Sequence, residues 1–231
     1  MSELFSIQLQ NRQQQGRDGV WLDLPTTTEQ VQVALRQIGI SSDNPQGLFI
    51  SGYFAEEEKR FAIPYNMVLA SNVDELNFLA ARLETLSAGE RAELNAALQA
   101  PQSELFSIGR ITDFPENVDY YVHLPDVHGP AQLGDYYLNR SGMVDMPEEW
   151  KGGIDTAQFG RYVAQREQGV FTEYGYLIKS GDAWQKVHEG QPVPEEYRVL
   201  SFPVSEILRD AANIPPPVQS TTEQQKVIPI I

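Results

Sequence analysis

Three histidines offer the first candidate chemistry in this chain. His123 and His128 flank Asp126, and together they place three possible metal ligands in one short segment. A zinc site uses three or four ligands at defined spacing, and no further strong ligand follows nearby. We therefore interpret these residues as part of a loop without a metal role. A metal-dependent hydrolase built on this trio is the alternative.

Paired carboxylates are the second candidate, because general acid–base catalysis often uses two of them. The runs at residues 56–58 and 148–149 consist of adjacent glutamates, whose side chains point in different directions on a helix or strand. Each run is more typical of a solvated patch. The chain has no cysteine, and no G-x-S-x-G, P-loop or G-x-G-x-x-G motif occurs in it. We predict a protein that is not an enzyme, with no catalytic residue, metal or cofactor.

Acidic residues outnumber basic ones throughout the chain. The sequence has 32 Asp and Glu against 17 Lys and Arg, a net charge of −15. Residues 1–101 and 102–181 each contribute −6 and the remainder −3, so the charge is spread along parts of the sequence that are expected to fold. Such a chain repels nucleic acid and anionic membranes, and attracts basic surfaces such as a DNA-binding groove. Simple solubility is the alternative explanation.

Composition places the protein in a broad class. Its 41% hydrophobic content is sufficient for ordinary cores, and no run approaches the 18 apolar residues of a membrane span. The first residues lack the apolar region of a secretory signal. We predict a soluble protein of the cytoplasm.

The pattern of elements predicts an α+β fold of three small parts followed by an extension. Residues 1–70 form a mixed part with a short antiparallel sheet, 71–101 a helical hairpin, and 102–181 a second mixed part. Residues 182–231 form an extension with a flexible tail after a proline run. Capping boxes are expected at Thr26 or Thr27, Asn72 and Ser87. Strands are predicted at 4–9, 20–24, 48–54, 105–111, 118–124, 174–178 and 197–202, and further helices at 133–138, 156–166 and 203–210.

Four ordered fragments resemble the ArdA antirestriction family over about residues 1–180. They are Gly19-Val-Trp-Leu-Asp-Leu-Pro25, Asp74-Glu-Leu-Asn-Phe-Leu-Ala80, Leu133-Gly-x-Tyr-Tyr137, and the stretch from Met146-Pro-Glu148 to Gly175-Tyr176. The resemblance implies an elongated and curved chain of three parts that forms a homodimer through the third. It implies that the protein acts in the cytoplasm of a bacterial host. It also implies a DNA mimic that occupies the DNA-binding groove of type I restriction–modification enzymes, at their methyltransferase and specificity core. Restriction, and possibly modification, would be blocked.

The family's antirestriction motif, close to Y-F-D-Y-E-A-F-G-R-D, is altered here. Asp155, Phe159, Gly160 and Arg161 are retained, whereas the glutamate is Ala157 and the final aspartate is Tyr162. Two carboxylates are thus lost, so a different target or other carboxylates are expected. An inhibitor or adaptor directed at another defence system, of the CRISPR or BREX type, is the alternative function.

Charge density limits how closely the chain can imitate DNA. A dimer with 30 net charges matches only about 50 Å of duplex, which carries one charge per ~1.7 Å. Spread over an elongated dimer, this is about a quarter to a third of the density of DNA. Mimicry therefore requires acids concentrated on one face. We expect this acidic surface to use residues at helix starts and exposed turns: Asp74, Glu75, Glu84, Glu90, Glu93, Asp113, Glu116, Asp119 and Asp126.

Overall fold

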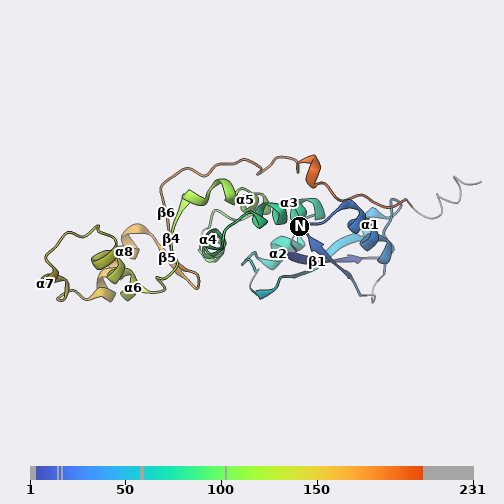
Figure 1. Ribbon diagram of the computed structural model, residues 1–231. Coiled ribbons are helices and arrows are strands. Elements are labelled where there is room, and N and C mark those ends of the chain that lie inside the picture. Colours follow the sequence, from blue (N-terminus) through green and yellow to red (C-terminus); the bar gives the residue numbers. More distant parts are fainter. Residues whose placement is uncertain (1–3, 15, 17, 58–59, 102, 205–231) are drawn as a thin grey trace, which may run out of the picture.

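The computed structural model describes residues 4–14, 16, 18–57, 60–101 and 103–204. The chain is elongated, with its mixed α/β parts at the two ends and helices between them (Figure 1). Two three-stranded antiparallel sheets, ordered β2-β1-β3 and β4-β6-β5, account for the strands of these residues. The predicted fold class is confirmed.

The N-terminal sheet forms as its alternating pattern predicts. Strands β1 (Phe5–Asn11), β2 (Val20–Leu24) and β3 (Leu48–Phe54) bury one face under α1 (Thr28–Gln37). Thr27 is the residue that caps α1, in a capping box with Gln30. Gly39 ends this helix region with a φ of 67°, a conformation that glycine adopts without steric cost. A short 3-10 turn, η1 (Pro45–Gly47), leads into β3.

The central helices share one hydrophobic core with this sheet. After α2 (Tyr65–Leu69), the capping boxes predicted at Asn72 and Ser87 begin α3 (Val73–Glu84) and α4 (Ala88–Gln99). The core continues from β1 through α3 and α4 as far as Leu177 and Val199. Because burial is continuous, the helical hairpin is stabilised by docking on its neighbours.

The predicted third part, residues 102–181, contains α5 (Ile108–Thr112), β4 (Tyr121–Leu124), α6 (Pro130–Asp135), the π-helical turn η5 (Tyr136–Arg140) and α7 (Glu148–Lys151). It ends with α8 (Thr156–Glu167), β5 (Val170–Thr172) and β6 (Gly175–Lys179). Two 3-10 turns, η3 (Phe114–Glu116) and η4 (Val118–Tyr120), precede β4. The strand predicted at 105–111 is wrong, because the Ser107 side chain accepts the N–H of Arg110 and begins a helix there.

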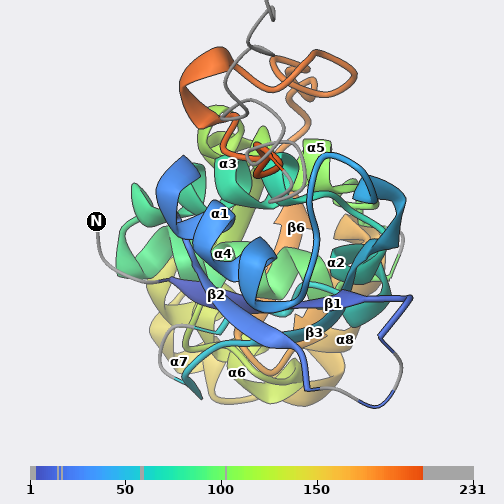
Figure 2. The same cartoon turned by 90° about the vertical axis from the view of Figure 1, so that its right-hand side faces the viewer.

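The extension returns along the molecule. From β6 it passes α5 and α3 and reaches α1, on the side of the helices opposite to the N-terminal sheet (Figures 1 and 2). Its one regular element in the described residues is the 3-10 turn η6 (Glu195–Tyr197), so the strand predicted at 197–202 is wrong. Near its end, the Ser42 N–H donates to the Pro203 carbonyl at 2.9 Å. The helix predicted at 203–210 and the expected flexible tail lie almost entirely outside the described residues.

Candidate functional surface

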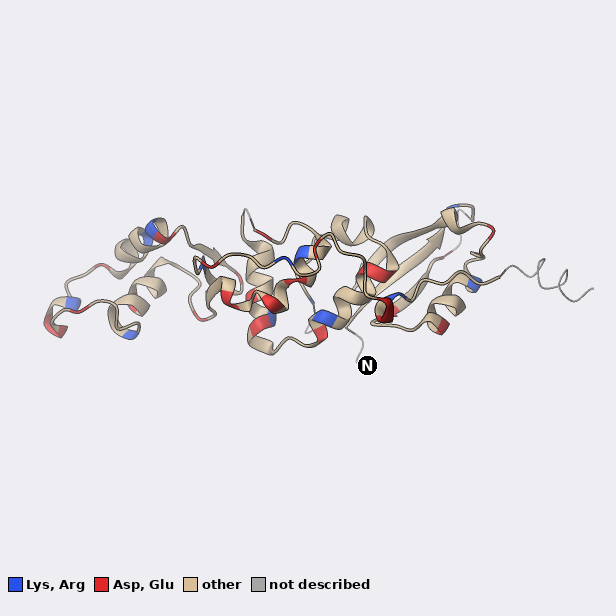
Figure 3. Ribbon diagram, turned by 90° about the horizontal axis from the view of Figure 1, so that it is seen from above, with Lys and Arg blue, Asp and Glu red and all other residues tan. Residues whose placement is uncertain are grey.

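Acidic positions occur along the whole length of the molecule, with basic ones among them (Figure 3). The carboxylates expected to form the acidic surface fall into three settings. Asp119 and Asp126 are exposed, as expected for turn residues. Glu75, Glu84 and Glu90 are half-buried on α3 and α4. The remaining four, which have partners or surroundings inside the fold, are described next.

Two aspartates of this set hold the extension. Asp74 Oδ1 accepts the N–H groups of Val199 and Leu200, both at 2.7 Å. Asp113 is fully buried, and its two oxygens accept the N–H groups of His188 at 2.6 Å and Glu189 at 3.2 Å. The expectation that Asp113 is exposed is therefore wrong. Its carboxylate binds backbone N–H groups that lie 75 and 76 residues later in the sequence.

An ion pair occupies a third position of the set. Glu116 bonds to Arg82 of α3, and both side chains are partly exposed. Nearby, Arg110 is buried and pairs with Glu104 at 3.0 Å and with Glu189 of the extension at 3.1 Å. Paired carboxylates contribute less to the field outside the protein than unpaired ones, so Glu116 adds little to an acidic surface.

Glu93 differs from the other acids in its protonation. It lies half-buried on α4 near Glu90 and Asp119, and its Oε1 is buried without a hydrogen-bond partner. Burial, reinforced by the two neighbouring carboxylates, raises its pKa from 4.5 to about 8. At neutral pH the side chain is mostly uncharged, so its contribution to the acidic surface is small. Hydrogen bonds from Ser87 instead lower the pKa of Glu90.

We expect a Glu93→Gln variant to be more stable than the wild type in alkaline solution. Because the folded state raises the pKa of Glu93, the stability it contributes is complete below pH 4.5 and is lost as the pH rises through about 8. After allowance for solvent screening, the gain at high pH should be about 1 kcal/mol. Urea unfolding at acidic and alkaline pH measures it. Glu149→Gln, at an exposed position, is the control, and equal pH profiles for both variants would refute the assignment.

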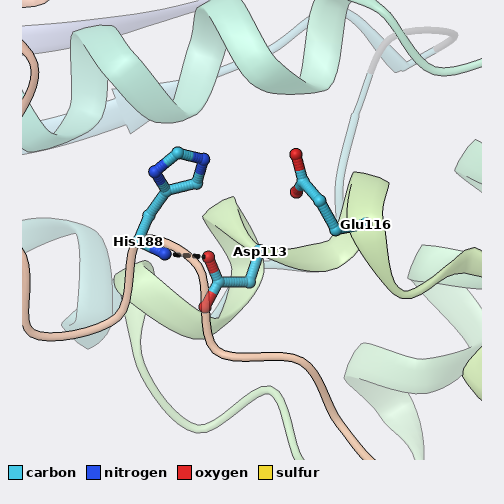
Figure 4. A group of neighbouring side chains, drawn as sticks. All are labelled: Asp113, Glu116 and His188. Carbon is cyan, nitrogen blue, oxygen red and sulfur yellow. Dashed lines mark hydrogen bonds between the residues drawn. The ribbon is translucent and has the colours of Figure 1, made fainter.

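Asp113, Glu116 and His188 form the one cluster of possible metal ligands in the described part of the chain, with ligand atoms within 4.8 Å of one another (Figure 4). The trio of His123, Asp126 and His128, considered above as the alternative metal site, is not brought together as such a cluster. His123 Nε2 instead lies 2.7 Å from the Tyr174 carbonyl oxygen. Both oxygens of Asp113 already accept hydrogen bonds, and Glu116 pairs with a cation. We therefore assign no metal to the cluster.

The residues retained from the antirestriction motif shape the start of α8. Asp155 caps the helix by accepting the Gln158 N–H at 2.9 Å. Gly160 is buried at the crossing with α6, where an added Cβ would lie 1.8 Å from the Pro130 carbonyl oxygen. Phe159 is half-buried and Arg161 is exposed. Two of the four retained residues, Asp155 and Gly160, thus have clear structural roles.

The tip of the third part has a small core. Its buried cluster comprises Val127, Leu133 and Tyr176, and Gly160 is the one buried residue of α8. Large apolar side chains remain exposed in the same part of the chain, with Met143 at 75%, Trp150 at 66% and Tyr162 at 55%. Exposed apolar side chains of this size are candidates for an interaction surface.

The set of carboxylates predicted for the acidic surface leaves out several exposed ones. Glu148 and Glu149 begin α7, and Glu195 and Glu196 begin η6; all four are exposed. A proline directly precedes each glutamate pair, and proline followed by acids is a usual helix-start signal. That signal could have identified them.

Comparison with known proteins adds one match. A family model described as antirestriction protein (ArdA) matches residues 15–178, and no curated protein matches the chain. The match includes all nine predicted carboxylates and the motif at 155–162, and it ends before the extension. No helix of the described residues is both long enough and apolar enough to cross a membrane.

Proposed function

Since the chain belongs to the ArdA family of antirestriction proteins, we propose that it blocks restriction by occupying the DNA-binding groove of a type I restriction–modification enzyme. The observation that carries this proposal is a net charge of −15 distributed along an elongated body. Carboxylates take the place of phosphates on the basic residues of the groove. Inhibition of this kind is non-catalytic and requires no cofactor.

The acids that act in this way are those with exposed oxygens. Asp119 and Asp126 belong to this group, together with Glu149 of α7 and the glutamate pair that begins η6, whereas Glu148 pairs with Lys151. Asp74 and Asp113 support the surface from within, because they bind the extension to the central helices. The mimic therefore depends on the collective field of several exposed acids, and single substitutions among them cost little.

A homodimer formed through the third part would double the length of the acidic surface. The half-covered apolar side chains around α7 and α8 support this arrangement, because pairing two copies would bury Trp150 and Tyr162. The two motif positions that lack their carboxylate here, Ala157 and Tyr162, both lie on α8. An apolar residue and an exposed aromatic suit a subunit interface better than a contact with basic groups.

We expect the complex with a type I methyltransferase core to weaken steeply with salt. Contacts between carboxylates and basic side chains are screened as ionic strength rises, as phosphate contacts are. Between about 50 and about 200 mM salt, the dissociation constant should rise at least about tenfold. Isothermal titration calorimetry at several salt concentrations measures the dissociation constant. A dissociation constant independent of salt would refute charge mimicry.

A further inference from the structure

The N-terminal sheet has a face that no helix of the described residues covers. The strand register places two rows of outward residues side by side: Asp23, Ser6 and Phe54 in one, and Trp21, Gln8 and Gly52 in the next. Helix α1 packs on the opposite, apolar face (Figure 1). Two large aromatic side chains are exposed on this face, Trp21 at 49% and Phe54 at 53%.

The two aromatic rings form a defined platform. Their centroids lie 6.4 Å apart at 72°, an edge-to-face pair. Trp21 extends across β1 towards β3, since a Cβ added at Gly52 would lie 3.0 Å from its Cη2 atom. The indole thus lies over Gln8 and Gly52, which support one side of the ring. Its exposed area is held in place by the sheet, which lowers the entropy cost of binding.

Carboxylates lie on this face and in the chain segments next to its strands. Asp23 is exposed on the same face, and its Oδ1 accepts the Ser6 hydroxyl at 2.8 Å. Asp18 and Glu57 are also exposed, in the segments that precede β2 and follow β3. A ring with nearby negative charge attracts a cation both through its π-face and through the carboxylates.

The same face already shows how such a ring binds a cation. At its other end, the Arg12 guanidinium lies 5.3 Å from the centre of the Phe49 ring. Among the described residues, no Lys or Arg lies over Trp21 or Phe54. The platform therefore presents an acidic, aromatic site to a cation from another molecule.

We propose that Trp21 and Phe54 anchor the protein on its target by stacking against an arginine side chain of the target's basic surface. This inference rests on the proposed function, because a DNA-binding groove supplies exposed arginines. It adds a short-range contact to the long-range attraction of the acids. Buried tryptophan and arginine contacts dominate the energy of many interfaces, whereas scattered surface charges contribute little each.

The test compares Trp21→Ala with Trp21→Phe and with Phe106→Ala, which removes a 62% exposed aromatic ring outside the N-terminal sheet. Binding to a type I methyltransferase core should weaken at least about tenfold for Trp21→Ala at both low and high salt. Trp21→Phe should retain most of the affinity because a ring remains, and Phe106→Ala should stay within about twofold of the wild type. Binding of Trp21→Ala equal to that of the wild type or Phe106→Ala would overturn the anchor.

A second measurement does not depend on how well the alanine variant folds. The chain has 3 tryptophans, so a Trp150→Phe/Trp184→Phe variant retains Trp21 as its fluorophore. Acrylamide should quench its emission in the free protein and much less in the complex. Quenching that is unchanged on binding would overturn the anchor, even if the complex forms. Failure of the wild type to bind the enzyme would overturn the proposed function itself.

Discussion

Replacing Asp113 with alanine is expected to lower the free energy of unfolding by about 3 kcal/mol. The side chain is fully buried and accepts two backbone N–H groups, from His188 and Glu189. Alanine leaves both donors without a partner, and each buried unsatisfied donor costs about 1–3 kcal/mol. The extension should then detach from α5 before the rest of the protein unfolds. Urea denaturation and hydrogen exchange at residues 185–200 measure the two effects.

Asp119→Ala provides the matched control for this variant. Asp119 lies in the next turn, has the same side chain and is exposed. Its removal should change the free energy of unfolding by less than about 0.5 kcal/mol. Similar losses for the two variants would show that the buried carboxylate does not hold the extension. Loss of global stability without faster exchange in the extension would contradict the same assignment.

The second large effect is expected at Gly160, where we predict that alanine destabilises the tip of the third part by about 3 kcal/mol. The added Cβ would lie 1.8 Å from the Pro130 carbonyl oxygen and 2.8 Å from the Gly134 nitrogen. These are backbone atoms, so α6 and α8 must separate to make room. The small cluster around Leu133 offers little burial to offset that separation. Thermal unfolding followed by circular dichroism measures the change.

Gly89→Ala is the control for this substitution. Gly89 lies in the first turn of α4, and a Cβ there meets no atom within 4 Å. Because alanine favours the helix, this variant should be more stable than the wild type by up to about 1 kcal/mol. If Gly160→Ala behaved like Gly89→Ala, the close helix crossing would be wrong. If the dimer forms through this part, Gly160→Ala should also weaken dimerisation in sedimentation experiments.

Local signals in the sequence predicted much of the first two parts. The alternation of β1 and β2 and the capping boxes at Thr27, Asn72 and Ser87 each depend on residues within one element. A Ser or Asn side chain three residues before a Glu satisfies free helix N–H groups without any distant partner. Such elements can be read from the chain because their stabilisation is local.

Elements that depend on distant contacts could not be predicted in this way. Residues 197–202 have a strand-like composition, yet their backbone N–H groups bond to Asp74, a side chain more than 120 residues earlier. Asp113 looks like a turn acid, and its burial follows from the return of residues 188–189. Contacts across 75 or more residues leave no periodic pattern in either segment.

The exposure expected for the nine carboxylates was therefore correct for some of them and wrong for others. Composition established the excess of carboxylates, and the choice of helix starts and turns identified exposed acids such as Asp126. It could not separate them from Glu93, whose burial raises its pKa to about 8, or from Glu116, which pairs with Arg82. Net charge is a property of composition, whereas the field at the surface depends on which acids the fold leaves unpaired.

The most direct test of the proposed function is displacement of DNA from its target. A fluorescent duplex bound to a type I methyltransferase core is titrated with the protein, and anisotropy reports the bound DNA. We predict complete displacement, with a midpoint that rises in proportion to the DNA concentration, as competition for one groove requires. Anisotropy that stays at its bound value while the protein forms a ternary complex would contradict DNA mimicry.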